Sequence, residues 1–212
     1  MKKILVAILG ALFAAPSFAQ YSSGGFSLSE SSVYYGIRLG MNMATLTGDA
    51  PIDGTRIGLN FGGTVGLRLS DTTPVFLESG LYFTGSGASK DKQSTSLNYL
   101  EIPLLIKYGV QVTDDIALLP FVGPTFRYGI FGGKTKFLGD KYDAFGDDAL
   151  PRMQYKRADM GIKLGCGAEY NKLYLELGYQ FGITNIANWT LQNGDDPSAH
   201  NGALFINLGV NF

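Results

Sequence analysis

The sequence has a single cysteine and a single histidine among its 212 residues. Because Cys166 has no partner in the chain, no intramolecular disulfide can form, and the fold must be held by its own packing. Charged residues make up only 17 % of the chain, against about 25 % in a typical soluble domain. The formal net charge is −1, which gives no electrostatic basis for binding nucleic acid.

Long apolar runs are also missing beyond the N-terminal segment, so no membrane-spanning helix is predicted. Residues 1–19 begin with Lys2 and Lys3, continue with a short apolar stretch and end in small residues. This order is typical of a secretory signal peptide, with cleavage expected near Ala19–Gln20. Residues 20–32 are rich in Ser and Gly and are predicted to be a flexible segment. The rest, 33–212, has a length that suits one domain.

Eight segments of this domain alternate between apolar and polar residues, as strands with two different faces do. They lie at 33–44, 57–69, 75–85, 97–109, 117–130, 158–170, 173–184 and 202–212. One face carries no charge, whereas the other is rich in glycine and carries five cations and five anions. The charged residues are Arg38, Arg68, Lys107, Arg127 and Lys163, with Glu78, Glu101, Asp159, Glu169 and Glu176.

Alternation alone does not say which face points outward, because a soluble lipocalin-type barrel has its apolar face inside. Three features favour an apolar exterior. Glycine packs nothing on a solvated sheet but makes room in a narrow lumen. Connections at 45–56, 86–96, 131–157 and 185–201 are long, and those at 70–74, 110–116 and 171–172 are short. Aromatic residues gather at the strand ends. The prediction is an all-β, eight-stranded antiparallel up-and-down transmembrane β-barrel in a lipid bilayer.

Three stretches resemble a known family. Leu208, Val210 and Phe212 resemble the C-terminal signal that outer-membrane barrels present to the barrel assembly machinery. The stretches "YLEIPLLIKYGV" and "PFVGPTFRYGIFGG" are similar to the PorT-like outer-membrane β-barrel family of Gram-negative bacteria. The resemblance implies location in the outer membrane and favours an envelope-assembly or secretion accessory role. It supplies no catalytic residues and no cofactor.

The ten charged residues have two readings. They can form a network that neutralises itself and fills the lumen, or they can line a narrow pore for small solutes. Unpaired ions in a narrow lumen are costly, so we expect the network. In the long loops, aromatic residues offer contacts for a protein partner: Phe137, Tyr142, Phe145 and Trp189. The alternative for Trp189 is that it marks the membrane interface.

Other candidate sites carry weaker signals. His200 follows Ser198 and Asp195 or Asp196, which could build a lipid hydrolase or acyltransferase at the barrel rim, but turns are commonly rich in Ser and Asp. The acidic run "GDKYDAFGDD" lacks the glycine and glutamate of a calcium loop. We expect neither an enzyme nor a cofactor or metal ion. Cys166 is predicted to face lipid, and Pro103 is predicted to cause a bulge or a local break in its strand pairing.

Overall fold

The structure is a computed structural model that describes residues 33–130, 133–146, 149, 153–189 and 196–212. The predicted signal peptide and flexible segment lie outside these residues. The chain forms strands β1 (Val33–Gly48), β2 (Thr55–Arg68), β3 (Val75–Lys90), β4 (Gln93–Tyr108), β5 (Val110–Gln111), β6 (Ile116–Gly129), β7 (Lys134–Phe137), β8 (Asp140–Asp143), β9 (Ala158–Tyr170), β10 (Leu173–Gly182) and β11 (Ala199–Asn211). None of the described segments is a helix long and apolar enough to cross a membrane.

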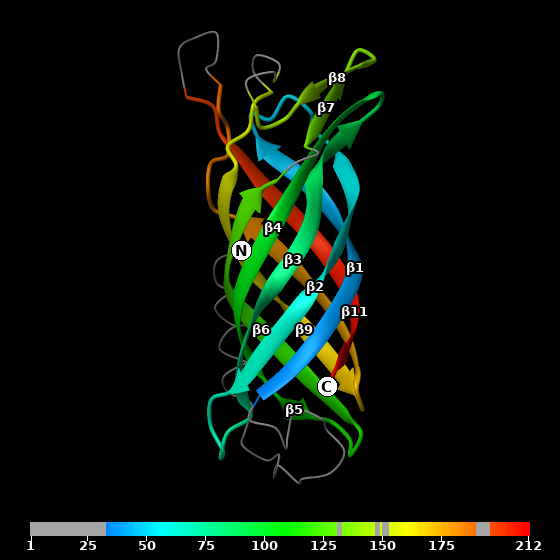
Figure 1. Cartoon of the computed structure of the whole chain (residues 1–212), viewed down its shortest axis with the longest axis vertical. Helices are drawn as coiled ribbons and strands as arrows, with labels where there is room; N and C mark the ends of the chain where they lie inside the picture. Colours follow the sequence, from blue (N-terminus) through cyan, green and yellow to red (C-terminus); the bar gives the residue numbers. More distant parts are fainter. Residues whose placement is uncertain (1–32, 131–132, 147–148, 150–152, 190–195) are drawn as a thin grey trace, which may run out of the picture.

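Eight of these strands close into a barrel, as predicted (Figure 1). Each strand pairs antiparallel with the next along the chain, in the ring β1-β2-β3-β4-β6-β9-β10-β11. The ring closes where β11 pairs with β1, from Gly36 opposite Asn211 to Gly48 opposite Ala199. Full closure leaves the eight-stranded wall without a free edge. The short β5 pairs with β6, and β7 and β8 extend the sheet above one end of the barrel.

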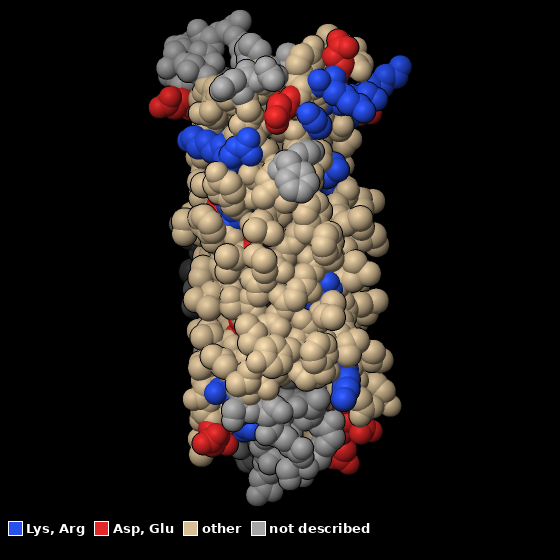
Figure 2. All heavy atoms as spheres, in the orientation of Figure 1, with Lys and Arg blue, Asp and Glu red and all other residues tan. Residues whose placement is uncertain are grey.

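The apolar face points outward and the polar face points inward. In β1, Leu39 is 63 % exposed while the neighbouring Arg38 is 1 % exposed, and this alternation recurs in the other barrel strands. On the visible face, a band almost free of charged side chains separates two charged ends (Figure 2). This arrangement is the reverse of a lipocalin-type barrel and suits a wall in contact with lipid. Cys166 is exposed on this outer face.

The two ends of the barrel differ in their connections. The end where β1 begins and β11 finishes, here called the lower end, has short turns (Figure 1). The tightest is Asn171-Lys172, where Asn171 adopts φ 53° and Tyr170 lies opposite Leu173. A two-residue hairpin needs such a positive φ. The opposite end, here called the upper end, carries the longer connections together with β7 and β8.

One of the predicted long connections is wrong. Residues 86–96 do not form a polar loop, because β3 runs on to Lys90, turns at Asp91-Lys92 and returns as β4 from Gln93. Asp91 adopts φ 54°, as a two-residue hairpin requires. The segment is rich in Ser and Gly and has few apolar residues, so the sequence shows no alternation between apolar and polar residues there. The predicted loop at 131–157 likewise contains the β7–β8 hairpin.

The predicted disturbance at Pro103 is a local break rather than a bulge. On one side of β4 the pairing with β3 skips Ile102 and Pro103, and on the other side the pairing with β6 skips Leu104 and Leu105. The register is the same before and after each gap, so no extra residue is inserted. Proline has no N–H to donate to a neighbouring strand. The Pro103 carbonyl is satisfied separately, because it accepts from the Ser79 hydroxyl at 2.8 Å.

Glycine in the wall makes room for large rings in the lumen. A Cβ atom at Gly66 would overlap the ring of Tyr34, and one at Gly167 would overlap the ring of Tyr174. Both tyrosines are almost completely buried. The high glycine content of the polar face therefore reflects close packing inside a narrow barrel.

Candidate functional site

The lower half of the lumen is organised around one carboxylate, that of Glu78. Lys107 Nζ lies 2.7 Å from one of its oxygens, and Arg38 lies 3.6 Å from the other. The hydroxyl of Tyr34 donates to the same carboxylate at 2.7 Å. The side chains of the ion-paired residues are at most 2 % exposed. One buried anion is therefore shared by two buried cations.

A second carboxylate, Glu176, completes this group. It lies 3.9 Å from Lys107 and accepts a hydrogen bond from Asn207 at 2.7 Å. Tyr174 contacts both cations. Its hydroxyl accepts from Lys107 Nζ at 2.8 Å, and its ring centroid lies 4.1 Å from the central carbon of the Arg38 guanidinium. We call Arg38, Glu78, Lys107 and Glu176 the lower cluster.

Glu169 is connected to the lower cluster through an amide. Arg38 donates to the side-chain oxygen of Asn211 at 2.6 Å, and the amide nitrogen of Asn211 donates to Glu169 at 2.7 Å. The Asn211 amide thus bridges the Arg38 guanidinium and the Glu169 carboxylate. Asn211 is the last residue of β11 and is completely buried.

The upper half of the lumen holds two separate ion pairs, here called the upper pairs. Lys163 pairs with Glu101, and Arg127 pairs with Asp159 at 2.5 Å. Asn201 also donates to Asp159, at 2.7 Å. Each carboxylate here has one cationic partner.

Arg68 lies at the edge of the barrel rather than deep in the lumen. It is half-buried at the lower end of β2, and its guanidinium donates to the backbone carbonyls of Ser70 and Asp71 at 2.9 and 3.2 Å. These contacts hold the turn between β2 and β3. The structure therefore brings nine of the ten predicted charges into the buried interior.

Apolar clusters separate and close these polar groups. Leu105, Phe121 and Phe205 form a layer in the middle. Lys107 contacts the ring of Phe121 and Lys163 contacts the ring of Phe205, so the layer lies between the lower cluster and the upper pairs. At the lower end a further buried cluster contains Tyr34, Phe76, Ala117, Leu119 and Tyr174.

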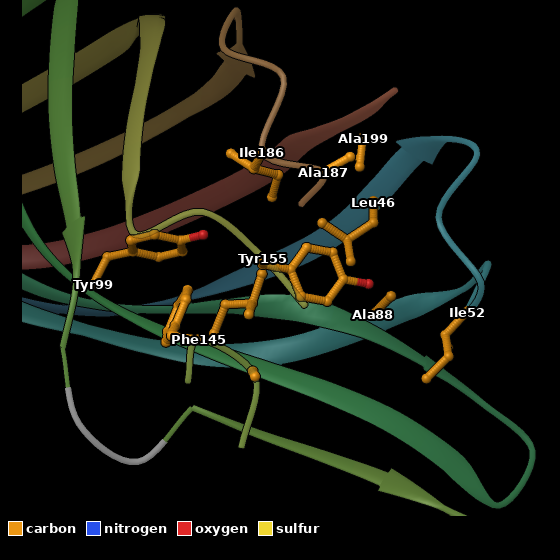
Figure 3. Packing of buried hydrophobic residues seen from close by; sticks show 11 residues of the cluster. Leu46, Ile52, Ala88, Tyr99, Phe145, Tyr155, Ile186, Ala187 and Ala199 are labelled. Carbon is orange, nitrogen blue, oxygen red and sulfur yellow. The ribbon is translucent and has the colours of Figure 1, made fainter. Parts of the chain in front are cut away.

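The mouth at the upper end is closed by the largest apolar cluster (Figure 3). Its members come from strands and from the loops above them: Leu46, Ile52, Ala88, Leu97, Tyr99, Ala144, Phe145, Tyr155, Ile186, Ala187 and Ala199. Phe145 packs edge-on against Tyr99, with ring centroids 5.7 Å apart. The expectation that Phe145 offers a surface contact is therefore wrong, because its ring is buried in the mouth.

The other predicted loop aromatics remain partly accessible. Phe137 and Tyr142 are half-buried on the β7–β8 hairpin. Trp189 is half-buried and packs edge-on against Tyr155, with ring centroids 5.4 Å apart. Trp189 therefore supports the mouth cluster as well as facing the surface.

The structure does not bring the residues considered for a hydrolase at the barrel rim into a catalytic group. Ser198 donates its hydroxyl to Asp49 at 3.2 Å, and Nδ1 of His200 has no hydrogen-bond partner. Asp196 is exposed, and Asp195 lies outside the described residues. Within the described part of the chain, no three His, Cys, Asp or Glu side chains are grouped as metal ligands would be.

Several members of the network were missed by sequence reasoning. Tyr34, Tyr99, Asn201 and Asn211 all connect charged groups. Tyr34 and Tyr99 have the same parity along their strands as the predicted lumenal charges Arg38 and Glu101, which was the available signal for them. Asn201 and Asn211 stand on β11, which carries no predicted lumenal charge, and alternate there with the apolar residues of the outer face. Their partners lie on strands that are far apart in the sequence, so the sequence alone could not pair them.

The fold was compared with known proteins. Neisserial surface protein A is 14 % identical with a TM-score of 0.50, and the alignment covers 86 % of this chain and 98 % of that one. The outer membrane protein OprG of Pseudomonas aeruginosa is 10 % identical with a TM-score of 0.47, covering 89 % and 98 %. The attachment invasion locus protein of Yersinia pestis is 11 % identical with a TM-score of 0.44, covering 86 % and 100 %. At these identities the likeness shows the fold alone.

At the level of sequence, no curated protein matches the chain. The family described as outer membrane protein beta-barrel domain does match, over residues 18–188. This match covers most of the chain, and it agrees with the closed barrel and its apolar exterior. The chain therefore belongs to the outer membrane protein beta-barrel domain family, as an integral protein of the outer membrane.

Proposed function

We propose that this protein is a non-conducting outer-membrane barrel that acts through the loops above its mouth, as an interaction or envelope-assembly protein. The observation that carries the proposal is the closed lumen. The ion-paired side chains inside it are at most 10 % exposed, and apolar clusters lie above, between and below them. A pore for small solutes needs charges that water can reach, so this interior favours a structural role.

The finer assignment to the PorT-like family supports an accessory role in secretion or envelope assembly. The barrel assembly machinery is the partner that we propose during insertion. Leu208, Val210 and Phe212 are exposed at the end of β11, where they are accessible for recognition. For a protein partner in the mature barrel, Phe137, Tyr142 and Trp189 are the proposed contacts.

We further propose that the protein is not an enzyme. A serine nucleophile needs a base within hydrogen-bond reach. The Ser198 hydroxyl instead contacts Asp49, whose carboxylate also accepts from the Ser198 backbone at 2.9 Å. This double contact joins the residue after β1 to the residue before β11. Lipid hydrolysis that disappears in His200→Ala would contradict this part of the proposal.

Solute uptake tests the non-conducting barrel. The purified protein is reconstituted into liposomes, and the rate of osmotic swelling is measured in small sugars and amino acids. We expect the same rate as in protein-free liposomes. A known porin in parallel liposomes shows that the assay detects a pore, and swelling at the porin's rate would overturn the proposal.

The role of the loops is tested separately in cells that lack the native protein. One variant replaces residues 134–143 by a short Gly/Ser turn, and a matched variant carries Glu101→Gln with Lys163→Met in the lumen. We expect the first to lose function, measured as envelope integrity, and the second to retain it. The opposite pattern would place function in the lumen.

A further inference from the structure

One row of side chains crosses the sheet extension above the barrel. Ser89 lies opposite Ser94, Ser94 lies opposite Lys136, and Lys136 lies opposite Lys141. Residues directly opposite each other in antiparallel strands share a face, with Cβ atoms about 5 Å apart. These four residues, here called the hydroxyl–lysine row, therefore align two hydroxyls and two ammonium groups across β3, β4, β7 and β8.

The hydroxyl–lysine row faces away from the barrel axis. Thr95 and Thr135, the sequence neighbours of Ser94 and Lys136, point the other way, because both are completely buried and their hydroxyls lie 3.3 Å apart. Lys136 and Lys141 are exposed. Figure 2 shows cationic side chains gathered on this side of the upper end, over β7 and β8. The row thus faces the surroundings of the barrel, beyond the apolar band.

The two lysines of the row form no ion pair with any other described residue. Like charges directly opposite each other on a sheet are destabilising. Among the described residues, no carboxylate lies within ion-pair distance of Lys136 or Lys141, whereas the exposed Lys90 is 3.9 Å from Asp53. Lys134, two residues before Lys136 on the same face of β7, has Asp143 directly opposite. An external anion would relieve the repulsion in the row.

A hollow lies beside the row, between the tips of the β3–β4 and β7–β8 hairpins. Its volume is about 650 Å³, and it is lined by Ser89, Asp91, Lys92, Gln93, Ser94, Lys136, Leu138 and Gly139. This volume falls within the usual range for small-molecule sites. Hydroxyl and carboxylate groups bind sugar hydroxyls, and ammonium groups bind phosphate. Six of the eight lining residues carry polar or charged side chains, so the hollow offers contacts to a phosphorylated sugar, with Leu138 as its one large apolar side chain.

We propose that the hydroxyl–lysine row and its hollow bind the phosphorylated sugar headgroup of a glycolipid in the surrounding outer leaflet. Lys136 and Lys141 hold the phosphate, and Ser89, Asp91 and Ser94 contact the sugar. A membrane lipid is the source favoured by the outward direction of the row and by its place beyond the apolar band, at the end whose longer connections face the cell exterior. The proposal does not depend on whether the lumen conducts.

The test uses the full protein in nanodiscs of three compositions: phosphatidylcholine alone, with bisphosphorylated lipid A, and with the same lipid A after removal of its phosphates. Retained glycolipid is measured by native mass spectrometry, and affinity is measured by titration. We expect selective retention of the phosphorylated form. The variant with Lys136→Gln and Lys141→Gln should bind about ten-fold more weakly or worse, because it loses charge-assisted hydrogen bonds.

The control removes two cations at the same end but outside the row, Lys90→Gln and Lys156→Gln, and should bind as the native protein does. All four lysines are exposed, so both variants should fold, and heat-modifiable migration on a detergent gel verifies this. Equal binding by the row variant, or equal retention of dephosphorylated lipid A, would overturn the proposal. Soluble glucosamine phosphate that binds as tightly as the glycolipid would show that a free saccharide, not a lipid, is the ligand.

Discussion

The lower cluster and the upper pairs contain the same kinds of charge but distribute them differently. In the lower cluster one carboxylate, Glu78, faces both Lys107 and Arg38. In the upper pairs each of Glu101 and Asp159 has a single cationic partner. Losing the shared anion would leave two buried cations without their main partner, whereas losing one anion of an upper pair would leave one. We therefore expect the loss of unfolding free energy to depend on how many buried cations the substituted carboxylate faces.

The largest effect is expected for Glu78→Gln. The amide keeps the shape of the side chain but leaves Lys107 with Glu176 at 3.9 Å, and Arg38 connected to Glu169 through Asn211. Breaking a buried ion pair costs about 3–5 kcal/mol, and we expect the loss of unfolding free energy to reach the upper end of that range. Urea unfolding in detergent micelles, followed by the fluorescence of the single tryptophan, measures it. A loss no greater than that of Glu101→Gln would remove the distinction between the two groups.

The next effect comes from the upper pairs. Glu101→Gln should cost about 3 kcal/mol, because Lys163 is left buried without its carboxylate. Adding Lys163→Met removes the second charge as well, and the double variant should return to within about 1 kcal/mol of the native protein, since apolar replacements of whole buried pairs are often neutral. The same unfolding assay applies. Additive losses in the double variant would mean that the two charges do not act as a pair.

A smaller effect tests the lower cluster without changing any charge. Gly167→Val places side-chain atoms where the ring of Tyr174 now lies, and Tyr174 contacts both Lys107 and Arg38. Overpacking of this kind costs about 1–3 kcal/mol. The matched control is Gly63→Val, because a Cβ atom at Gly63 would meet only one distant backbone oxygen. Equal stability of the two variants would show that the ring is free to move.

The smallest effect concerns the mouth cluster at high pH. Burial raises the pKa of Tyr155 to about 12, above its ordinary value of about 10. The neutral ring stabilises the folded state below pH about 10, and this contribution is lost as the pH rises toward about 12, because the unfolded chain ionises first. Tyr155→Phe should remove that part of the alkaline loss. Trp189 packs on this ring, so its fluorescence reports the change, and identical pH profiles would contradict the assignment.

The fold was largely predictable from the sequence because strand periodicity survives wherever one face is apolar. The strand predicted at 158–170 has the same bounds as β9, and the strand predicted to start at 173 is β10. Prediction failed where both faces are polar or small, as in the upper parts of β3 and β4. There Ser, Thr and Gly carry no alternation between apolar and polar residues, although the backbone is extended and paired.

The candidate site was predictable in its composition but not in its connections. Parity along each strand assigned Glu101 and Lys163 to the lumen, but their pairing depends on barrel closure, which brings together residues 62 positions apart. The mouth cluster was missed because Ile52, Phe145 and Ile186 come from irregular segments that show no periodicity. Their inward direction is set by tertiary packing rather than by local sequence.

Conductance of the native protein in a planar lipid bilayer tests the closed, charge-paired lumen most directly. The account predicts no steady current above that of the bare bilayer across the accessible voltage range, because apolar clusters close both ends of a lumen whose paired charges are buried. A large and steady ionic conductance from correctly folded, heat-modifiable protein would contradict it.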